Sequence, residues 1–238
     1  VEETMLYLES EAKGRVSRSR LRQISETVVS EVARFNGTAE RTMPHDDSWQ
    51  FYRVGVFFER AIGTLSLLEV ALPRIVETYR AKDEENADLT ALLRLLGSLD
   101  AYRREFRSRA YVDRVARILI TGKSNPSSVA FSLRNLQYAI GTLSIHGERE
   151  LGKNLLANVG DILVLLESFS LVKQGSPQME MLDAGLSDDL VIKVKPEELS
   201  EELTALVATI EQIHVRIEDV FFSHQDVFAR DPILFDLG

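Results

Sequence analysis

The residues with the clearest chemical potential are an adjacent glutamate and arginine, Glu59 and Arg60, inside a long apolar stretch. Gly55, Glu59 and Gly63 are spaced at i, i+4 and i+8, so they share one face if the stretch is helical. Each interior helical glycine costs about 1 kcal/mol relative to alanine, and a closely packed helix or ligand would offset that cost. Because helical neighbours point in different directions, we expect Glu59 and Arg60 to interact with other groups.

Three interpretations of this pair are open. In the structural interpretation, Glu59 is tucked between the glycines and met by an arginine, because buried charges are nearly always paired. In the second, the pair binds a ligand or a partner protein. In the third, Glu59 is the catalytic residue, a general base in a dry pocket lined by Trp49, Tyr52 and Tyr102.

A second group of candidates lies in an arginine-rich segment. Residues 101–120 contain six arginines against Glu105 and Asp113, a local excess of four positive charges in a chain of net charge −9. The planar guanidinium group suits carboxylates and phosphates, so the segment predicts an anion site. Alternatively, these arginines form ion pairs with Glu59 or with the acidic segments 82–88 and 197–202. The candidate ligand-binding residues of this segment are Tyr102, Arg103, Arg107 and Arg109.

Other polar motifs have simpler explanations. Asn125 and Pro126 are typical of a helix start, with Asn125 as the N-cap, and such a start can also hold an anion. Glu211 and His214 have the Glu-x-x-His spacing of carboxylate-bridged di-metal sites, but such sites need a second pair, which the sequence lacks. We therefore predict no metal and no cofactor. His224 is expected to be a cation at a helix C-terminus.

Composition excludes several classes of function. The chain has no cysteine, so it has no disulfide or thiolate nucleophile, which fits a cytoplasmic protein. A net charge of −9 argues against nonspecific nucleic-acid or anionic-membrane binding. No apolar run approaches the ~18 residues of a membrane span. Val1 stands where an initiator methionine would, which is consistent with a fragment lacking an N-terminal part.

The elements that must position these residues are helices. Apolar residues recur at helical spacing through most of the chain, which predicts a single-domain all-α bundle of seven or eight helices over residues 1–238. The central helix should begin at Asp46 or Asp47 and stop or kink at Pro73, with two further turns beyond it. Residues 173–197 are expected to be an irregular loop insertion. The other expected helices cover 2–12, 19–35 (closed by Asn36-Gly37), 89–96, 111–120, 126–145, 148–172 and 198–224, and a helix or helical turn is expected at 102–109.

Four segments in order resemble the bacterial alpha-E domain, an all-helical family named for its Glu-Arg motif. They are Thr42 to Phe51, Glu59-Arg60-Ala61, Tyr102 to Arg109 and Asn125 to Phe131. The resemblance covers roughly residues 20–225 and assigns the family motif to Glu59, Arg60, Trp49, Tyr102, Arg103, Arg107, Arg109, Asn125 and Pro126. Members also carry an earlier Glu-Arg helix, and no equivalent long helix precedes Arg20 here.

The resemblance also implies partners. Alpha-E domains are encoded beside, or fused to, circularly permuted ATP-grasp ligases and transglutaminase-like proteins. This implies an accessory, non-catalytic role in peptide or amide-bond synthesis or modification, with these residues binding an anionic or peptide ligand or the ligase itself. A purely structural interaction module, using a separate apolar patch, is the remaining alternative.

Overall fold

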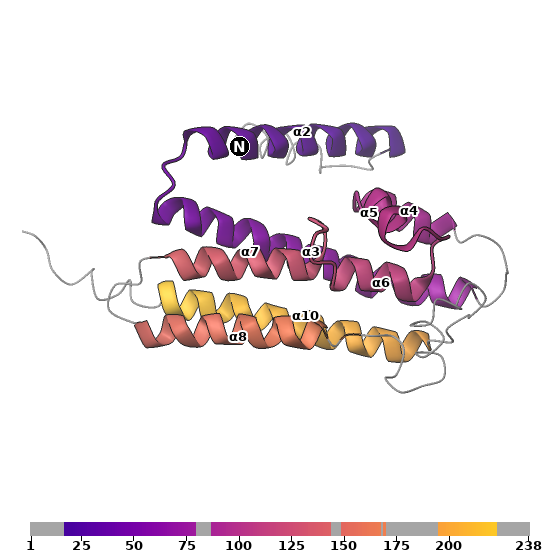
Figure 1. The fold of residues 1–238 in the computed structure, drawn as a ribbon. Helices are drawn as coiled ribbons and strands as arrows, with labels where there is room; N and C mark the ends of the chain where they lie inside the picture. Colours follow the sequence, from indigo (N-terminus) through magenta and orange to yellow (C-terminus); the bar gives the residue numbers. More distant parts are fainter. Residues whose placement is uncertain (1–16, 80–86, 144–148, 168, 170–194, 223–238) are drawn as a thin grey trace, which may run out of the picture. The chain divides into compact units, whose positions relative to one another are not determined.

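The computed structural model describes residues 17–79, 87–143, 149–167, 169 and 195–222. These residues form helices and connecting turns with no strand, which confirms the predicted all-α fold. The chain divides into two compact units, Val1–Trp49 (unit 1) and Gln50–Gly238 (unit 2), which are described separately. The described helices, labelled in Figure 1, are α2 (Arg18–Thr42), α3 (Asp47–Tyr79), α4 (Ala87–Leu95), α5 (Leu99–Phe106), α6 (Val112–Ile120), α7 (Val129–Thr142), α8 (Arg149–Glu167) and α10 (Pro196–Phe221).

Some predicted elements lie outside the described residues. These are the helix at 2–12, the end of the helix predicted at 148–172, most of the 173–197 segment, and His224. The last part of that segment is described, and there the prediction was wrong. Pro196 and Glu197 are already helical. Proline suits the first position of α10, because the N–H that it lacks would have no partner within the helix there and its ring fixes φ near the helical value. None of the described helices combines the length and low polarity that crossing a bilayer requires.

Unit 1 consists mainly of the amphipathic helix α2. The side chain of Ser17 caps its start by accepting a hydrogen bond from the Arg20 amide at 3.2 Å. The predicted end at Asn36-Gly37 was wrong, because α2 continues to Thr42. Good helix formers follow Gly37, and a lone glycine costs only about 1 kcal/mol. In the connection to α3, the buried Trp49 ring stacks on His45 at 4.7 Å between centroids.

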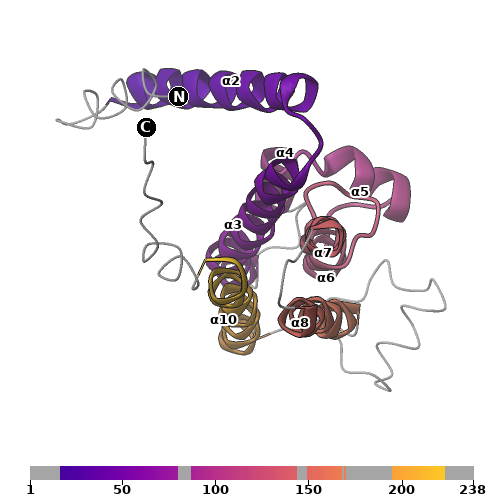
Figure 2. The same ribbon diagram turned by 90° about the vertical axis from the view of Figure 1, so that its left-hand side faces the viewer.

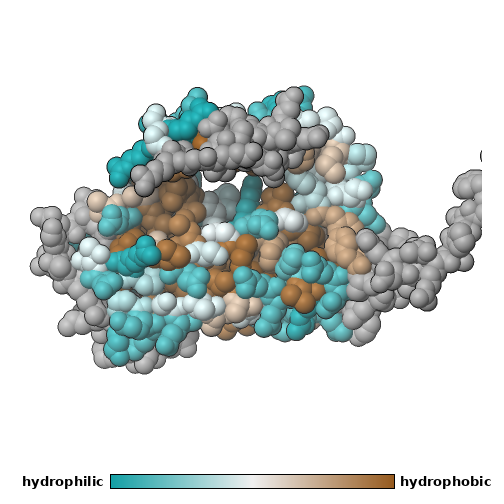
Figure 3. All heavy atoms as spheres, turned by 180° about the vertical axis from the view of Figure 1, so that it is seen from behind, coloured by the Kyte–Doolittle hydropathy of each residue, from teal (hydrophilic) through white to brown (hydrophobic). Residues whose placement is uncertain are grey.

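Unit 2 is built around four antiparallel helical rows, seen nearly end-on in Figure 2: α3, α6 followed by α7, α8, and α10. Two contacts join α3 to α7 and to the turn that precedes it. Thr64 Oγ1 of α3 donates to the Ser127 carbonyl in that turn at 3.1 Å. The Arg53 guanidinium of α3 lies 5.5 Å from the ring centre of Tyr138 on α7. Two more fix α3 against α10: Phe58 stacks on His214, and Thr204 Oγ1 donates to Glu69 Oε1 at 2.6 Å. Figure 3 views this unit from the side of α3 and α10, where apolar and polar atoms are interspersed.

The long helix α3 begins as its sequence predicts, but it does not stop at Pro73. Asp46 Oδ1 accepts a hydrogen bond from the Ser48 amide at 3.0 Å, which satisfies one free N–H of the first turn. The helix runs through Pro73 to Tyr79. Its core-facing stripe contains one buried polar residue, Thr64, and the apolar residues Val54, Phe58, Ala61, Leu65, Leu68, Leu72, Ile75 and Val76.

Three short helices, α4, α5 and α6, pack on one another at one end of unit 2. Gly97 ends α4 with a φ of 62°, a left-handed conformation that glycine adopts without steric cost. The Ser98 amide bonds the Leu93 carbonyl and the Gly97 amide bonds the Arg94 carbonyl, the two bonds of a Schellman motif. This turn places α5 and its arginines.

Candidate functional site

The Glu-Arg pair lies on the outward side of α3. Glu59 and Arg60 are both exposed, and so are Gly55 and Gly63. A Cβ added at either glycine would meet no atom of the described structure within 4 Å. Glu59 makes no hydrogen bond or ion pair with any described residue. The interpretation that Glu59 is buried and paired with an arginine was therefore wrong for the part of the chain described here.

The reason is the direction of the apolar stripe. Val54, Phe58, Ala61 and Leu65 face the core of unit 2, and this orientation turns the positions between them outward. Gly55, Glu59 and Gly63 share a face, as predicted, but it is the polar side of an amphipathic helix. The two glycines therefore leave open space along α3 rather than fitting a described neighbour.

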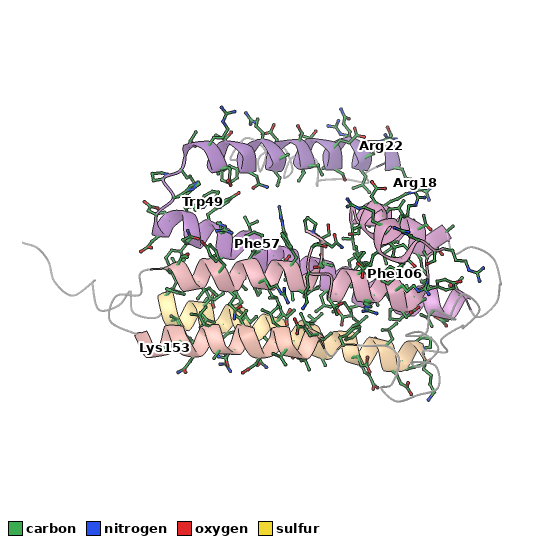
Figure 4. The ribbon with its side chains drawn as sticks, in the orientation of Figure 1. Arg18, Arg22, Trp49, Phe57, Phe106 and Lys153 are labelled. Carbon is green, nitrogen blue, oxygen red and sulfur yellow. The ribbon has the colours of Figure 1, made fainter. Side chains whose placement is uncertain are left out.

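A row of alternating cations and rings, which the sequence analysis missed, lies beside the Glu-Arg pair. The Arg53 guanidinium carbon is 5.4 Å from the Phe57 ring centre and 5.5 Å from that of Tyr138 on α7, and Arg60 lies 5.8 Å from Phe57. Figure 4 labels Phe57 on α3. The i, i+4 and i, i+3 spacings could have revealed the contacts within α3, whereas the contact with Tyr138 depends on helix packing.

Tyr102 is a structural anchor for the turn between α5 and α6. Its side chain is 1% exposed. The hydroxyl donates to the Arg109 carbonyl at 2.8 Å and accepts from the Tyr111 amide at 3.2 Å. Burial raises the pKa of Tyr102, so the hydroxyl stays protonated and able to donate. Because Tyr102 is enclosed in this way, it does not line an open pocket.

The arginines of this turn fall into two groups. Arg109 and Arg114 are held against Tyr111, each with its guanidinium carbon 5.1 Å from the ring centre. Arg109 Nε donates to the Tyr111 hydroxyl at 2.7 Å, and Arg114 Nη1 donates to Ser108 Oγ at 2.6 Å. Arg114 also lies 5.8 Å from the ring of Phe106, which Figure 4 labels near α6. This group shapes the turn.

The second group consists of exposed arginines. Arg103, Arg104, Arg107 and Arg117 are exposed, and no carboxylate of the described residues lies within 4.0 Å of their nitrogens. The alternative in which Arg103 and Arg107 bridge to Glu59 was therefore wrong. The predicted helix over 102–109 was also too long. Arg107 has a φ of 49°, which ends α5 at Phe106 in a left-handed turn.

The acidic residue of the same segment, Asp113, is mostly buried in the first turn of α6. Burial raises the pKa of its carboxyl, while the main-chain amides of Arg114 and Asp113 oppose this shift. Arg114 and Arg117 also favour the ionised form of Asp113, so this carboxylate balances part of the positive charge of α6. Glu105 is exposed beside Arg104, and the segment keeps its excess of positive charge.

Asn125 is a buried structural residue. Its amide donates to Ser98 Oγ at 3.0 Å and to the Ile118 carbonyl at 3.3 Å, so it ties the α4–α5 turn to the end of α6. The predicted N-cap role was wrong, because α7 begins at Val129 and Ser128 caps it by accepting from the Phe131 amide at 3.0 Å. The burial of Asn125 places its side chain away from any exposed ligand.

The Glu-x-x-His pair on α10 forms no metal site in the described structure. Glu211 and His214 are both exposed. The His214 ring stacks on Phe58 with centroids 5.3 Å apart, and its Nε2 lies 3.8 Å from Glu218. Among the residues that the structure describes, no cluster of three or more His, Asp or Glu side chains could hold a metal.

The structure thus brings Tyr102, Arg103, Arg107 and Arg109 together at the α5–α6 turn. Glu59 and Arg60 lie on the outward face of α3, and no described hydrogen bond or ion pair joins them to that turn. Trp49 belongs to unit 1.

Comparison with known proteins gives one match. A family model matches residues 1–222, and the family is described as a predicted alpha-helical domain with a conserved ER motif. No curated protein matches the chain. No solved structure matches it either. Since the matched region covers most of the chain and the described residues are helical, this chain belongs to the alpha-E family.

Proposed function

We propose that this chain is an accessory helical domain that works with an ATP-grasp-type ligase in the bacterial cytoplasm. In this proposal it contributes a binding surface for the ligase or for a peptide substrate during amide-bond synthesis or modification. The observation that carries the proposal is that Glu59 and Arg60 are exposed, while Glu59 has no described partner. A transglutaminase-like protein is the second partner class that the family resemblance suggests.

The geometry favours binding over catalysis. A general base at neutral pH usually depends on burial or on a nearby charge to match its pKa to that role. Glu59 is exposed and lies between two glycines on an open helix face. Such a face allows close approach of another helix or an extended peptide, with Glu59 accepting hydrogen bonds from a cationic group. Arg60, beside Phe57, adds a donor for a carboxylate.

The proposal is tested by coexpressing the chain with a circularly permuted ATP-grasp ligase encoded beside it and measuring complex formation and ATP turnover. We expect a stable complex that Glu59→Gln and Arg60→Ala weaken about tenfold each, as expected for charged contacts at an interface. Arg216→Ala on α10 is the matched control, since Arg216 is also exposed.

Two results would overturn the proposal. One is the absence of any complex at micromolar concentrations together with unchanged ligase turnover. The other is amide-forming or hydrolytic activity of the chain alone that Glu59→Gln abolishes, which would make Glu59 catalytic. A thermal-shift panel of anions, nucleotides and short peptides tests direct ligand binding, because a ligand at 100 times its Kd stabilises by about 2.7 kcal/mol.

A further inference from the structure

The turn between α5 and α6 is held in a fixed shape from two sides. From the core, the Tyr102 hydroxyl bonds the Arg109 carbonyl and the Tyr111 amide. From the outside, Arg114 bonds Ser108 Oγ and lies against the Tyr111 ring. The positions of the arginines on this turn are therefore set before any partner arrives, and less conformational entropy is lost on binding.

The exposed side of the turn is strongly cationic. Arg103, Arg104, Arg107 and Arg117 are exposed, and no carboxylate of the described residues pairs with them. We call these four residues the arginine surface. Arg103 and Arg104 lie in the last turn of α5, where the helix dipole favours positive charge. The dipole does not account for Arg107 and Arg117, which extend the positive charge beyond that turn.

The exposure of these four arginines determines which kind of anion they can bind well. A single small anion on exposed guanidinium groups gains little, because one ion pair at the protein surface is screened by water and contributes little free energy. A segment bearing several carboxylates forms several such pairs at once, and the gains combine. The chain carries a net charge of −9, so an acidic partner is attracted where positive charge is concentrated, and charge therefore also influences the orientation of approach.

We infer that the arginine surface at the α5–α6 turn is a docking site for an acidic segment of a partner protein. The inference rests on the proposed function, because it names the chemistry of the surface through which the ligase would dock. The partner contributes Asp and Glu side chains, and its association weakens with salt, since exposed charges are screened beyond about 10 Å at 0.1 M ionic strength.

The test uses the full chain and a fluorescent ten-residue polyglutamate peptide, with binding followed by anisotropy at low salt and at 0.5 M NaCl. We expect binding at low salt that the double substitution Arg103→Ala with Arg107→Ala weakens roughly tenfold. The matched control is Arg74→Ala with Arg216→Ala, which removes the same charge from exposed positions of α3 and α10. A polylysine peptide and inorganic pyrophosphate serve as competing probes.

Three results would overturn the inference: no polyglutamate binding at low salt, equal weakening by both double substitutions, or displacement of the peptide by equimolar pyrophosphate. The last would show a small-anion site instead. A ligase complex that forms without any polyglutamate binding refutes only this docking surface. Polyglutamate binding without a ligase complex refutes only the proposed function.

Discussion

The hydroxyl of Tyr102 and the main-chain carbonyl of Arg109 are joined by a 2.8 Å hydrogen bond across seven residues of sequence. The same hydroxyl accepts the Tyr111 amide, so one buried side chain satisfies two main-chain groups of an irregular turn. A tyrosine that the sequence placed among candidate ligand residues thus acts as a support for the arginines around it.

Tyr102→Phe should lower the free energy of unfolding by about 1–2 kcal/mol, because the partly buried Tyr111 amide loses its acceptor and the Arg109 carbonyl keeps only the Ser108 hydroxyl as a side-chain donor. Urea denaturation measures this loss, and hydrogen exchange at the Tyr111 amide should become faster. Tyr138→Phe is the control, since Tyr138 is 63% exposed, and it should change neither quantity. Equal stability of Tyr102→Phe and the wild type would contradict the anchoring role.

Asn125→Ala should cost roughly 2–3 kcal/mol, because Ser98 Oγ and the Ile118 carbonyl lose a donor in a buried position. Thermal unfolding measures the effect, with the exposed neighbour Ser124→Ala as a silent control. A double-mutant cycle with Ser98→Ala should give a coupling energy above about 0.5 kcal/mol. If Asn125→Ala left stability intact and removed only ligand binding, the structural role would be refuted.

Gly55→Ala and Gly63→Ala should each stabilise the chain by about 0.5–1 kcal/mol, because the added methyl group meets nothing within 4 Å in the described structure and alanine favours the helix. Chemical denaturation at equal m-value measures the gain. The same substitutions should weaken the proposed ligase complex, since a partner that approaches this face closely would meet the new methyl groups.

Gly122→Ala provides the contrasting control for those two glycines. A Cβ at Gly122 would lie 2.4 Å from the Ile118 carbonyl oxygen, so the substitution should destabilise by about 1–3 kcal/mol. Stability losses of similar size at all three glycines would show that the outward face of α3 is packed rather than open.

The contribution of Glu167 to the stability of the fold should depend on pH. Lys123 at 3.0 Å and Arg134 at 2.7 Å lower the pKa of its carboxyl. A lowered pKa means that the ionised form stabilises the fold above the ordinary pKa of glutamate, and that this contribution is lost as pH falls through the lowered value. Glu167→Gln should therefore reduce the melting temperature slightly at pH 7 and not at pH 2. The difference should also shrink in 1 M NaCl, because the group is exposed.

The spacing of apolar residues in the sequence was sufficient to predict the helices. In α10, for example, the buried residues are those that recur at helical spacing in the chain: Leu199, Leu203, Leu206, Ile210 and Ile213. Helix ends were harder. Asn125 and Ser128 are both good N-caps, and their competition is decided by Ser98 and Ile118, residues that only the fold brings near Asn125.

Helix packing also decided whether the face of α3 that carries Glu59 is buried or exposed. The spacing of Gly55 and Glu59 correctly places them on one face, but whether that face is buried depends on which stripe of α3 meets the other helices. Sequence alone offered a buried ion pair as readily as an open surface. In the arginine-rich segment, charge was visible in the chain, whereas the division into turn-forming and exposed arginines required the positions of Ser108 and Tyr111.

The hydrogen bond between Thr204 and Glu69 spans 135 residues, and it belongs to the contact between α3 and its neighbour α10. During synthesis at about 5–20 residues per second, the apolar stripe of α3 therefore leaves the ribosome roughly ten seconds before α10 can cover it. For that interval the side of α3 that packs against α10 is uncovered in the nascent chain, and exposed apolar surface of this kind is prone to aggregation.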